Sequence, residues 1–417
     1  MVGLGRRFQP VEITGVEDPE FYREGGFYPA SIGTVMDSTD WRLEHKLGAG
    51  GFGTVWLAQD MKSAEKSSDS PSTELFAIKV LTGNASKAES NEAKILRLLK
   101  HSSGAGDPDQ NKRVVDLIDE FNVTSPNGTH RCLVLGLSGP SALSLSKSLQ
   151  NGTLEPSLAR KVAHQTVQAV AWLHQSGVVH GDLHPGNILL NIEDFGNFPM
   201  DKVRDIFGKP IEVALVPFND HRRDDNAPEK VILPMQLHSV DLQHISGDIT
   251  IIDFGEAFTV EHPPQFLGTP ASYAAPEVLL QTGQYSAAVD LWSLACCIFE
   301  LRTGQKLFWA LVHPIQDVLR RQVELFGLLP RPLWEKWEDR LSWFEEDGTE
   351  KKDTPFPAEE NSLKEVIQNA AEQMPYLQLD DAEQEELLDL LSSLLKYEPD
   401  ERADAATVAN HPWFQSR

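Results

Sequence analysis

The sequence predicts an α+β protein, with a sheet and one helix in its first third and mostly helices after that. Alternating apolar residues over 41–60 flank a glycine-rich turn, which indicates a hairpin. Residues 75–81 have the composition of a strand, and residues 158–177 show the spacing of a long helix. A chain of 417 residues is too long for one small core, so we expect two packed lobes.

The same patterns predict the remaining elements. In the first third they predict one helix and two strands, over residues 88–99, 114–121 and 132–137. In the rest of the chain they predict two further helices, over residues 288–303 and 383–395. The first of these two is strongly apolar and should be buried. Residues 1–40 are predicted to be a turn-rich extension, and residues 336–361 a peripheral segment. Residues 194–248 lack a clear period and are predicted to be an insertion that is partly disordered or docked on the surface.

The composition is that of an ordinary globular protein, with 41% hydrophobic and 24% charged residues. The net charge of −25 disfavours direct binding to nucleic acid and favours a basic protein partner. No apolar run is long enough for a membrane span, and the first residues are a poor secretory signal. The three cysteines show no pattern of a disulfide framework or a zinc site, which favours a reducing compartment. Because no basic address tract is present, we expect the protein in the cytoplasm, the nucleus or both. We also expect a monomer.

The first chemical motif is a glycine-rich turn between two predicted strands: Gly48-Ala49-Gly50-Gly51-Phe52-Gly53-Thr54-Val55. Glycine lets the backbone approach phosphate groups closely, because no Cβ intervenes. Downstream, Lys79 lies inside an apolar strand and can grip α- and β-phosphates as a point charge. Such a lysine needs a carboxylate partner, for which Glu92 is the first choice and Glu89 the second.

The strongest motif is a short polar loop between two apolar strands: His180-Gly181-Asp182-Leu183-His184-Pro185-Gly186-Asn187. Asp182 can accept or orient the proton of a substrate hydroxyl, and Asn187 can bind Mg²⁺ through its amide oxygen. A second carboxylate, Asp253, follows another apolar strand in Asp253-Phe254-Gly255. Mg²⁺ prefers oxygen ligands and is commonly shared with substrate phosphates, so Asp253 is the other predicted metal ligand.

With Ala275-Pro276-Glu277 further on, these motifs in this order resemble the eukaryotic protein kinases from about residue 41 to residue 414. The resemblance implies a two-lobe kinase fold, with a β-rich lobe over 41–136 and a helical lobe over 137–417 that contains the insertion. It implies ATP and Mg²⁺ as cofactors, and it gives Asp290 the role of bracing the catalytic loop and Arg402 that of pairing with Glu277. It also implies that the nucleotide is bound by the glycine-rich turn, Lys79, Asn187 and four apolar residues: Leu47, Val55, Ala77 and Leu137.

A narrower similarity is to the SR-protein kinases. It rests on residues 22–33, on the strand around residues 130–134, on residues 317–330 and on the long spacer between Asn187 and Asp253. The similarity implies protein substrates rich in Arg and Ser, docked by acidic surfaces. The segment over residues 268–273 is closer to general serine/threonine kinases, so generic substrates stay open as an alternative.

Two positions depart from the family pattern. His184 stands where the family usually has lysine, and because histidine is only partly charged near pH 7 we expect a slower or pH-sensitive transfer. Gly181 replaces the arginine that usually precedes the catalytic aspartate. Without that cation a phosphorylated activation segment loses its main local partner, so we expect activity without such phosphorylation.

Two other readings compete. The loop that contains Asp182 also resembles that of small-molecule kinases acting on choline or aminoglycosides, which lack the segments around Glu277, Asp290 and Arg402. The second alternative is a nucleotide-binding pseudokinase scaffold, which the retained Lys79 and Asp182 disfavour.

Overall fold

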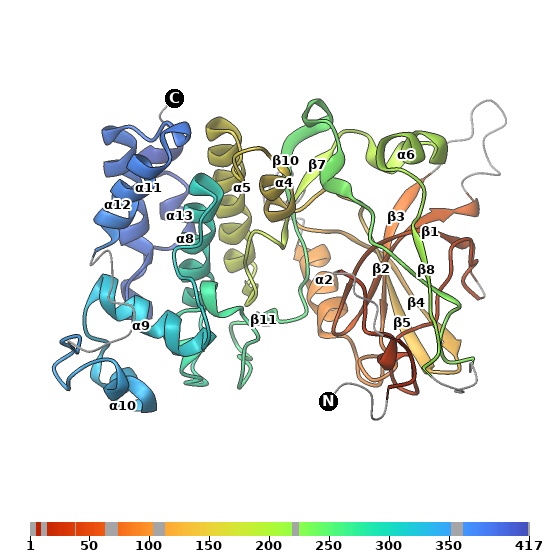
Figure 1. Cartoon of the computed structure of the whole chain (residues 1–417), viewed down its shortest axis with the longest axis horizontal. Coiled ribbons are helices and arrows are strands. Elements are labelled where there is room, and N and C mark those ends of the chain that lie inside the picture. Colours follow the sequence, from red (N-terminus) through yellow and green to blue (C-terminus); the bar gives the residue numbers. More distant parts are fainter. Residues whose placement is uncertain are drawn as a thin grey trace. The chain divides into compact units, whose positions relative to one another are not determined.

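The computed structural model describes residues 6–9, 15–37, 39–62, 74–102, 113–218, 225–351 and 362–415 (Figure 1). The chain forms two compact units. The first, here called the sheet unit, comprises Met1–Lys100, Val115–Gly139 and Asn191–Ser246. The second, here called the helical unit, comprises His101–Val114, Pro140–Leu190 and Gly247–Arg417.

The sheet unit is built on a five-stranded antiparallel sheet in the order β1-β2-β3-β5-β4. Its strands are β1 (Trp41–Gly50), β2 (Gly53–Asp60), β3 (Leu75–Leu81), β4 (Leu117–Ser125) and β5 (Gly128–Leu135). The helix α2 (Asn91–Ser102) follows β3 in the chain. One face of the sheet buries a cluster that includes Trp56, Ile78 and Val134, and such apolar burial stabilises the unit.

The helical unit contains most of the α-helices (Figure 1). They are α4 (Ala142–Ser148), α5 (Pro156–Gln175), α7 (Pro276–Leu279), α8 (Ala288–Thr303), α9 (Pro314–Phe326), α10 (Arg331–Lys336), α11 (Leu363–Gln373), α12 (Asp381–Leu394) and α13 (Ala405–Val408). α5 and α8 pack side by side. Every residue of α8 is buried, as its strongly apolar sequence predicts.

The remaining strands are short. They are β6 (Val178–Val179), β7 (Ile188–Ile192), β8 (Glu212–Ala214), β9 (Lys230–Ile232), β10 (Ile245–Ile251) and β11 (Phe258–Thr259), which pair as β10 with β7, β11 with β6, and β8 with β9. Two of these pairs frame the polar loops that the sequence singled out, because residues 180–187 connect β6 to β7 and residues 252–257 connect β10 to β11.

The predicted α+β class is confirmed, and the local chemistry explains where several helices begin and end. The N-cap Asp380 accepts a hydrogen bond from the backbone N–H of Glu383 at 2.9 Å, which satisfies a free donor at the start of α12. α8 ends at Gly304, whose φ of +73° is readily adopted by glycine. The predicted helix over 88–99 begins later, at Asn91, and the last sheet strands are shifted by a few residues.

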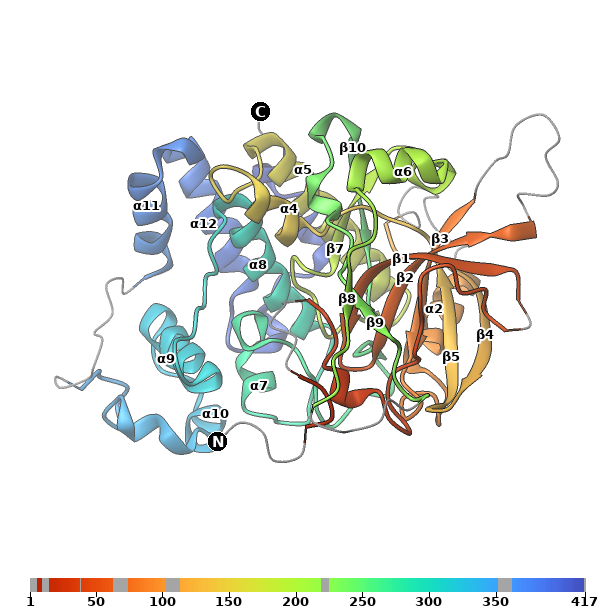
Figure 2. The ribbon, with the colours of Figure 1, turned by 45° about the vertical axis from the view of Figure 1, so that its right-hand side comes forward.

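The segment predicted as an insertion, over residues 194–248, is docked on the sheet unit. Its helix α6 (Met200–Phe207) lies next to the strands of the sheet unit (Figure 2). It supplies Val203 and Phe207 to a buried cluster that also contains Leu57 of β2 and Leu75 of β3. Burial of these side chains accounts for the docking, although their spacing in the sequence shows no period. Residues 219–224 of this segment lie outside the described residues, as do residues 63–73 of the polar stretch over 62–73, for which the sequence predicts an exposed loop.

The N-terminal extension packs on the same unit. Phe8, Tyr22 and Phe27 share a buried cluster with Leu215 and Val231 of the 194–248 segment. The side-chain amide of Asn127, in the turn between β4 and β5, donates to the carbonyl groups of Phe27 and Asn226 at 2.6 and 2.7 Å. These contacts join three distant segments of the chain within one unit.

The predicted peripheral segment over residues 336–361 is partly buried. Trp337 and Phe344 are 1% and 2% exposed and pack with Trp334 of α10. Residues 352–361 lie outside the described residues. Within the described ranges, no helix combines the length and the apolar character needed to cross a bilayer.

Candidate functional site

The glycine-rich turn joins β1 to β2 in the sheet unit. Gly53 packs against β3, where a Cβ atom would lie 2.4 Å from the carbonyl oxygen of Val80, so only glycine fits there. A Cβ built on Gly48, Gly50 or Gly51 meets no described atom within 4 Å. The backbone of the turn therefore faces open space in the sheet unit, as a phosphate-binding loop requires.

Lys79 lies on β3 and forms an ion pair with Glu92 of α2, with 2.7 Å between Nζ and Oε2. The lysine side chain is 16% exposed and that of Glu92 is 4% exposed. Glu89, the second choice from the sequence, precedes α2 and pairs instead with Arg97 at 2.8 Å. The structure thus selects Glu92 as the partner that holds the lysine in place.

The apolar candidates of the sheet unit lie around this lysine. Val55 is directly opposite Lys79 in the β2–β3 register, so the two side chains share one face of the sheet. Ala77, two residues before Lys79, belongs to the same face. Leu47 and Leu137 both pack against the buried cluster that α6 helps to form. The predicted nucleotide-binding residues of this unit are therefore arranged around one sheet face and the cluster beside it.

In the helical unit, a buried aspartate of α8, Asp290, fixes the backbone of the loop over residues 180–187. Asp290 accepts hydrogen bonds from the backbone N–H groups of His180 and Gly181 at 2.8 and 2.9 Å, and its carboxylate lies 2.9 Å from Nε2 of His174. Despite burial, these hydrogen bonds lower the pKa of Asp290 from its usual value, so this carboxylate is ionised at neutral pH. It fixes the backbone of the loop.

Within this loop, Asn187 orients Asp182. The amide Nδ2 of Asn187 donates to the backbone carbonyl of Asp182 at 2.9 Å and to its Oδ2 at 3.2 Å. The other carboxylate oxygen, Oδ1, is buried and has no hydrogen-bond partner in the described residues. Burial, followed by the nearby Asp253 carboxylate, raises the pKa of Asp182 to about 7. A buried oxygen without a partner at a loop tip is a ready acceptor for a ligand proton or a cation.

His184 is held beside Asp182 as a neutral imidazole. Its Nδ1 accepts a hydrogen bond from the N–H of Gly186 at 3.0 Å, which places the ring proton on Nε2, 3.8 Å from Oδ2 of Asp182. Burial, then the neighbouring His180, lowers the pKa of His184 to about 4. The expectation of a partly charged ring near pH 7 is therefore replaced by a neutral one. A Cβ on Gly186 would lie 2.7 Å from this ring, so Gly186 makes room for it.

Asp253 follows β10 and has a backbone φ of +66°, a strained conformation for a residue other than glycine. The loop that carries it is tied to the loop of Asp182: the N–H of Ile252 donates to the carbonyl of Asn187 at 3.0 Å, and His180 Nε2 lies 3.1 Å from the carbonyl of Ile252. Asp182, Asn187 and Asp253 are thus brought together in the helical unit.

A further contact joins the Asp182 loop to the segment over residues 256–270. The hydroxyl of Thr269 donates to the carbonyl of Gly181 at 2.5 Å, and the carboxylate of Glu256 accepts from the N–H of Gly268 at 2.9 Å. Gly181 has a φ of +74°, and a Cβ there would lie 2.7 Å from the carbonyl oxygen of Glu256. Sequence reasoning did not identify Glu256, although its position directly after Asp253-Phe254-Gly255 was a usable signal.

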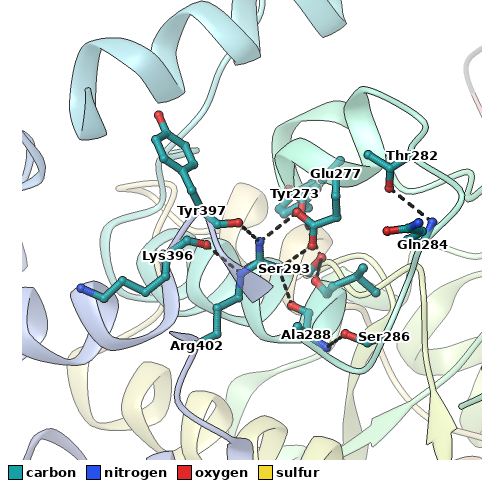
Figure 3. Close-up of polar contacts among 12 residues, drawn as sticks. Tyr273, Glu277, Thr282, Gln284, Ser286, Ala288, Ser293, Lys396, Tyr397 and Arg402 are labelled. Carbon is teal, nitrogen blue, oxygen red and sulfur yellow. Dashed lines mark hydrogen bonds and ion pairs between the residues drawn. The ribbon is translucent and has the colours of Figure 1, made fainter. Parts of the chain in front are cut away.

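Farther along the helical unit, Arg402 and Glu277 form a buried bidentate ion pair (Figure 3). Nη1 lies 2.6 Å from Oε1 and Nη2 lies 2.8 Å from Oε2. The same guanidinium donates to three backbone carbonyl groups, those of Ala288, Lys396 and Tyr397. All five guanidinium-based contacts are charge-assisted, so the pair links α7 to the segment after α12.

Comparison with known proteins gives a consistent result. The family model described as "Protein kinase domain" matches residues 41–202 and 240–414, which is most of the chain. The serine/threonine-protein kinase SRPK of Physarum polycephalum is 29% identical over 97% of this chain and 91% of its own length. The protein kinase dsk1 of Schizosaccharomyces pombe is 25% identical over 96% of this chain and 85% of its own length.

A human dual specificity protein kinase, CLK1, is 26% identical over 94% of this chain and 69% of its own length. Among solved structures, a crystal structure of a kinase domain matches with a TM-score of 0.61 at 21% identity, over 93% of this chain and 98% of that one. At this identity the structural match supports the fold.

Proposed function

The chain belongs to the protein kinase family, and from this premise we propose that it phosphorylates serine residues in Arg/Ser-rich proteins. It has the kinase fold and is a protein serine/threonine kinase that uses ATP. The observation that best supports the activity is the loop of the helical unit in which Asn187 orients Asp182 and leaves one of its carboxylate oxygens without a partner.

Each group has a role that its geometry allows. Lys79, fixed by Glu92, binds the α- and β-phosphates, while the backbone of the glycine-rich turn faces the phosphate chain. Val55, Ala77, Leu47 and Leu137 offer apolar contacts to the adenine base. Asp182 orients the substrate hydroxyl and accepts its proton as the oxygen bonds to the γ-phosphorus, while the bond from that phosphorus to the β–γ bridging oxygen breaks and ADP leaves.

The oxygen donors near Asp182 fit Mg²⁺. Asn187 and Asp253 would hold it through one amide and one carboxylate oxygen, which suits a hard cation that completes its shell with phosphate and water. When bound with ATP, the ion supplies charge neutralisation on the phosphates. The strained φ of Asp253 supports this role, because such strain is often maintained at functional positions.

Three observations favour a basic substrate. The chain carries a net charge of −25, which attracts basic peptides and repels acidic ones. Its matched relatives include a mouse protein named SRSF protein kinase 3, 33% identical over 43% of this chain. The resemblance of residues 22–33 and of the long spacer to SR-protein kinases supports the same substrate class.

The test is transfer of radiolabelled phosphate from ATP to two matched peptides, one rich in Arg-Ser dipeptides and one generic serine/threonine peptide. We expect kcat/KM to be at least about tenfold higher for the Arg-Ser peptide, and to fall about tenfold between low and high salt, because the attraction is electrostatic. Equal rates on both peptides would leave a general serine/threonine kinase and remove the proposed specificity.

Replacing His184 by lysine is expected to raise the rate of transfer about tenfold, because a permanent cation stabilises developing phosphate charge better than a neutral ring. The measurement is kcat under saturating ATP and peptide. His262→Lys is the control, because this exposed histidine also lies in the helical unit and adds the same charge. If His184→Lys brings no gain over the control, the neutral histidine does not limit transfer.

Treatment with a protein phosphatase is expected to leave activity unchanged, because the hydroxyl of Thr269 already ties the activation segment, residues 256–270, to the Asp182 loop, and Glu256 holds the neighbouring Gly268 within that segment. Removing that hold with Glu256→Ala should lower kcat about tenfold through misplacement of the segment. Glu261→Ala, at an exposed position a few residues later, should have no effect. Loss of activity after phosphatase treatment would show that a phosphate is needed after all.

A further inference from the structure

The sheet unit contains a buried ion pair that no catalytic role explains. Nζ of Lys46 lies 2.5 Å from both carboxylate oxygens of Glu17, and the two side chains are 1% and 0% exposed. The hydroxyl of Tyr22 donates to the same carboxylate. Nζ also lies 5.2 Å from the centre of the Trp56 ring. A buried charge is costly unless it is paired, so Lys46 depends on Glu17 to stay charged where it is.

Lys46 lies in β1, close to the start of the glycine-rich turn. It is the last residue before Leu47 and Gly48, and the pairing of β1 with β2 shifts register between Lys46 and Gly48. Such irregularities redirect a strand, and they are common beside functional sites. The backbone carbonyl of Lys46 accepts the N–H of Met235 at 2.8 Å, so the strand is held at this residue by its backbone as well as by its side chain.

The backbone of the turn that follows is held by the strands beside it, because β1 and β2 stay paired up to Gly50 opposite Gly53 and the carbonyl of Phe52 accepts the N–H of Thr82 at 2.8 Å. Among the described residues, no atom lies within 4 Å of the Cβ position of Gly48, Gly50 or Gly51. Beyond the pairing of β1 with β2, the sheet unit therefore holds the turn at two places: at Lys46, where β1 enters it, and at Phe52 and Gly53, which contact β3 and the residue after it. The first of these two anchors depends on a residue 29 positions earlier in the chain, in the N-terminal extension.

We propose that Glu17 is a positioning residue for the nucleotide phosphates: through its buried ion pair with Lys46 it sets the direction of the glycine-rich turn. Glu17 does not touch the nucleotide. The inference rests on the proposed function only in taking this turn as the phosphate-binding element. It gives the N-terminal extension an indirect part in ATP binding, since that extension supplies both Glu17 and Tyr22.

The experiment measures the dissociation constants of two probes, a non-hydrolysable ATP analogue and adenosine, by calorimetry on the full chain. For Glu17→Gln we expect the ATP analogue to bind about tenfold more weakly and adenosine to change less than about twofold, because only the phosphates contact the displaced turn. The double variant E17L/K46M removes both charges together, so analogue binding should return to within about threefold of wild type.

The control is Asp40→Asn, which breaks the exposed pair between Asp40 and Lys62 at the other end of the same hairpin and should change neither constant. If Glu17→Gln does not fold, as judged by circular dichroism, Glu17→Asp replaces it. This variant keeps the charge with a shorter reach, and it should weaken the analogue about threefold while leaving adenosine unchanged.

Equal weakening of both probes, unchanged binding in a folded variant, or a double variant as weak as Glu17→Gln would each overturn the proposal. The binding measurement also separates it from the proposed function. A wild-type protein that binds the analogue, shows the selective loss in Glu17→Gln and phosphorylates neither peptide would keep the positioning role and remove the proposed substrate. A protein that phosphorylates the peptides without the selective loss would do the reverse.

Discussion

Replacing Asp182 by asparagine is expected to lower the rate of phosphate transfer about 10³-fold, because a positioned base contributes roughly 10²- to 10⁴-fold to such a step. The amide has nearly the shape of the carboxylate, and the bond from Asn187 to the backbone carbonyl of residue 182 does not depend on the side chain. The loop should therefore keep its geometry while losing its proton acceptor. The measurement is the single-turnover rate with bound ATP.

The variant should fold at least as well as the wild type. Burial and the adjacent Asp253 raise the pKa of Asp182 to about 7, so the folded protein holds this carboxylate at some cost. Nucleotide binding should change by less than about threefold, because Asp182 acts on the hydroxyl and not on ATP. Asp201→Asn is the control, since the side chain of Asp201 is 93% exposed in α6. Retention of more than about a tenth of the rate would show that Asp182 is not the base.

Replacing Arg402 by methionine is expected to lower the free energy of unfolding by about 3–5 kcal/mol, because it leaves the buried carboxylate of Glu277 without its partner. The three backbone carbonyl groups that Arg402 satisfies would also lose a donor. Urea unfolding followed by tryptophan fluorescence measures the loss, and Trp292, which lies 5.2 Å under the guanidinium, is a local reporter.

A second variant tests how much of the lost stability comes from leaving the Glu277 carboxylate unpaired. In E277L/R402M both charges are gone, so part of the lost stability should return, as is found when a buried pair is replaced by apolar side chains. Arg331→Met breaks an exposed pair with Glu335 and should cause no measurable change. If Arg402→Met is as stable as this control, the bidentate pair contributes nothing to the helical unit.

The residues that carry the chemistry could be found from the sequence because their signals are local. A glycine-rich turn between alternating strands, a lysine inside an apolar strand and polar loops after apolar strands are each defined by a few neighbouring residues. Their order along the chain then indicated the family, and the strongly apolar pattern of residues 288–303 indicated a buried helix. Local pattern therefore determined the α+β class and the candidate catalytic residues.

What the sequence left open depends on contacts between distant residues. Two glutamates were possible partners for Lys79, and only the start of α2 at Asn91 places Glu92 within 2.7 Å. The charge of His184 depends on how deeply the ring is buried, which moves its pKa to about 4. Neither the partner of Lys79 nor the burial of His184 is reflected in a period or spacing of the sequence, so neither could be predicted from it.

The packing of the N-terminal extension and of the long spacer between Asn187 and Asp253 could not be predicted from the sequence for the same reason. Residues 15–37 and the described parts of the 194–248 segment show no regular pattern, yet they pack together on the sheet unit, and the first of these segments brings Glu17 to Lys46. Sequence by itself determined which chemical groups this kinase carries and in which order. Tertiary structure alone decided which of them are paired, which are buried and which charges they hold, because burial and pairing are properties of neighbours in space.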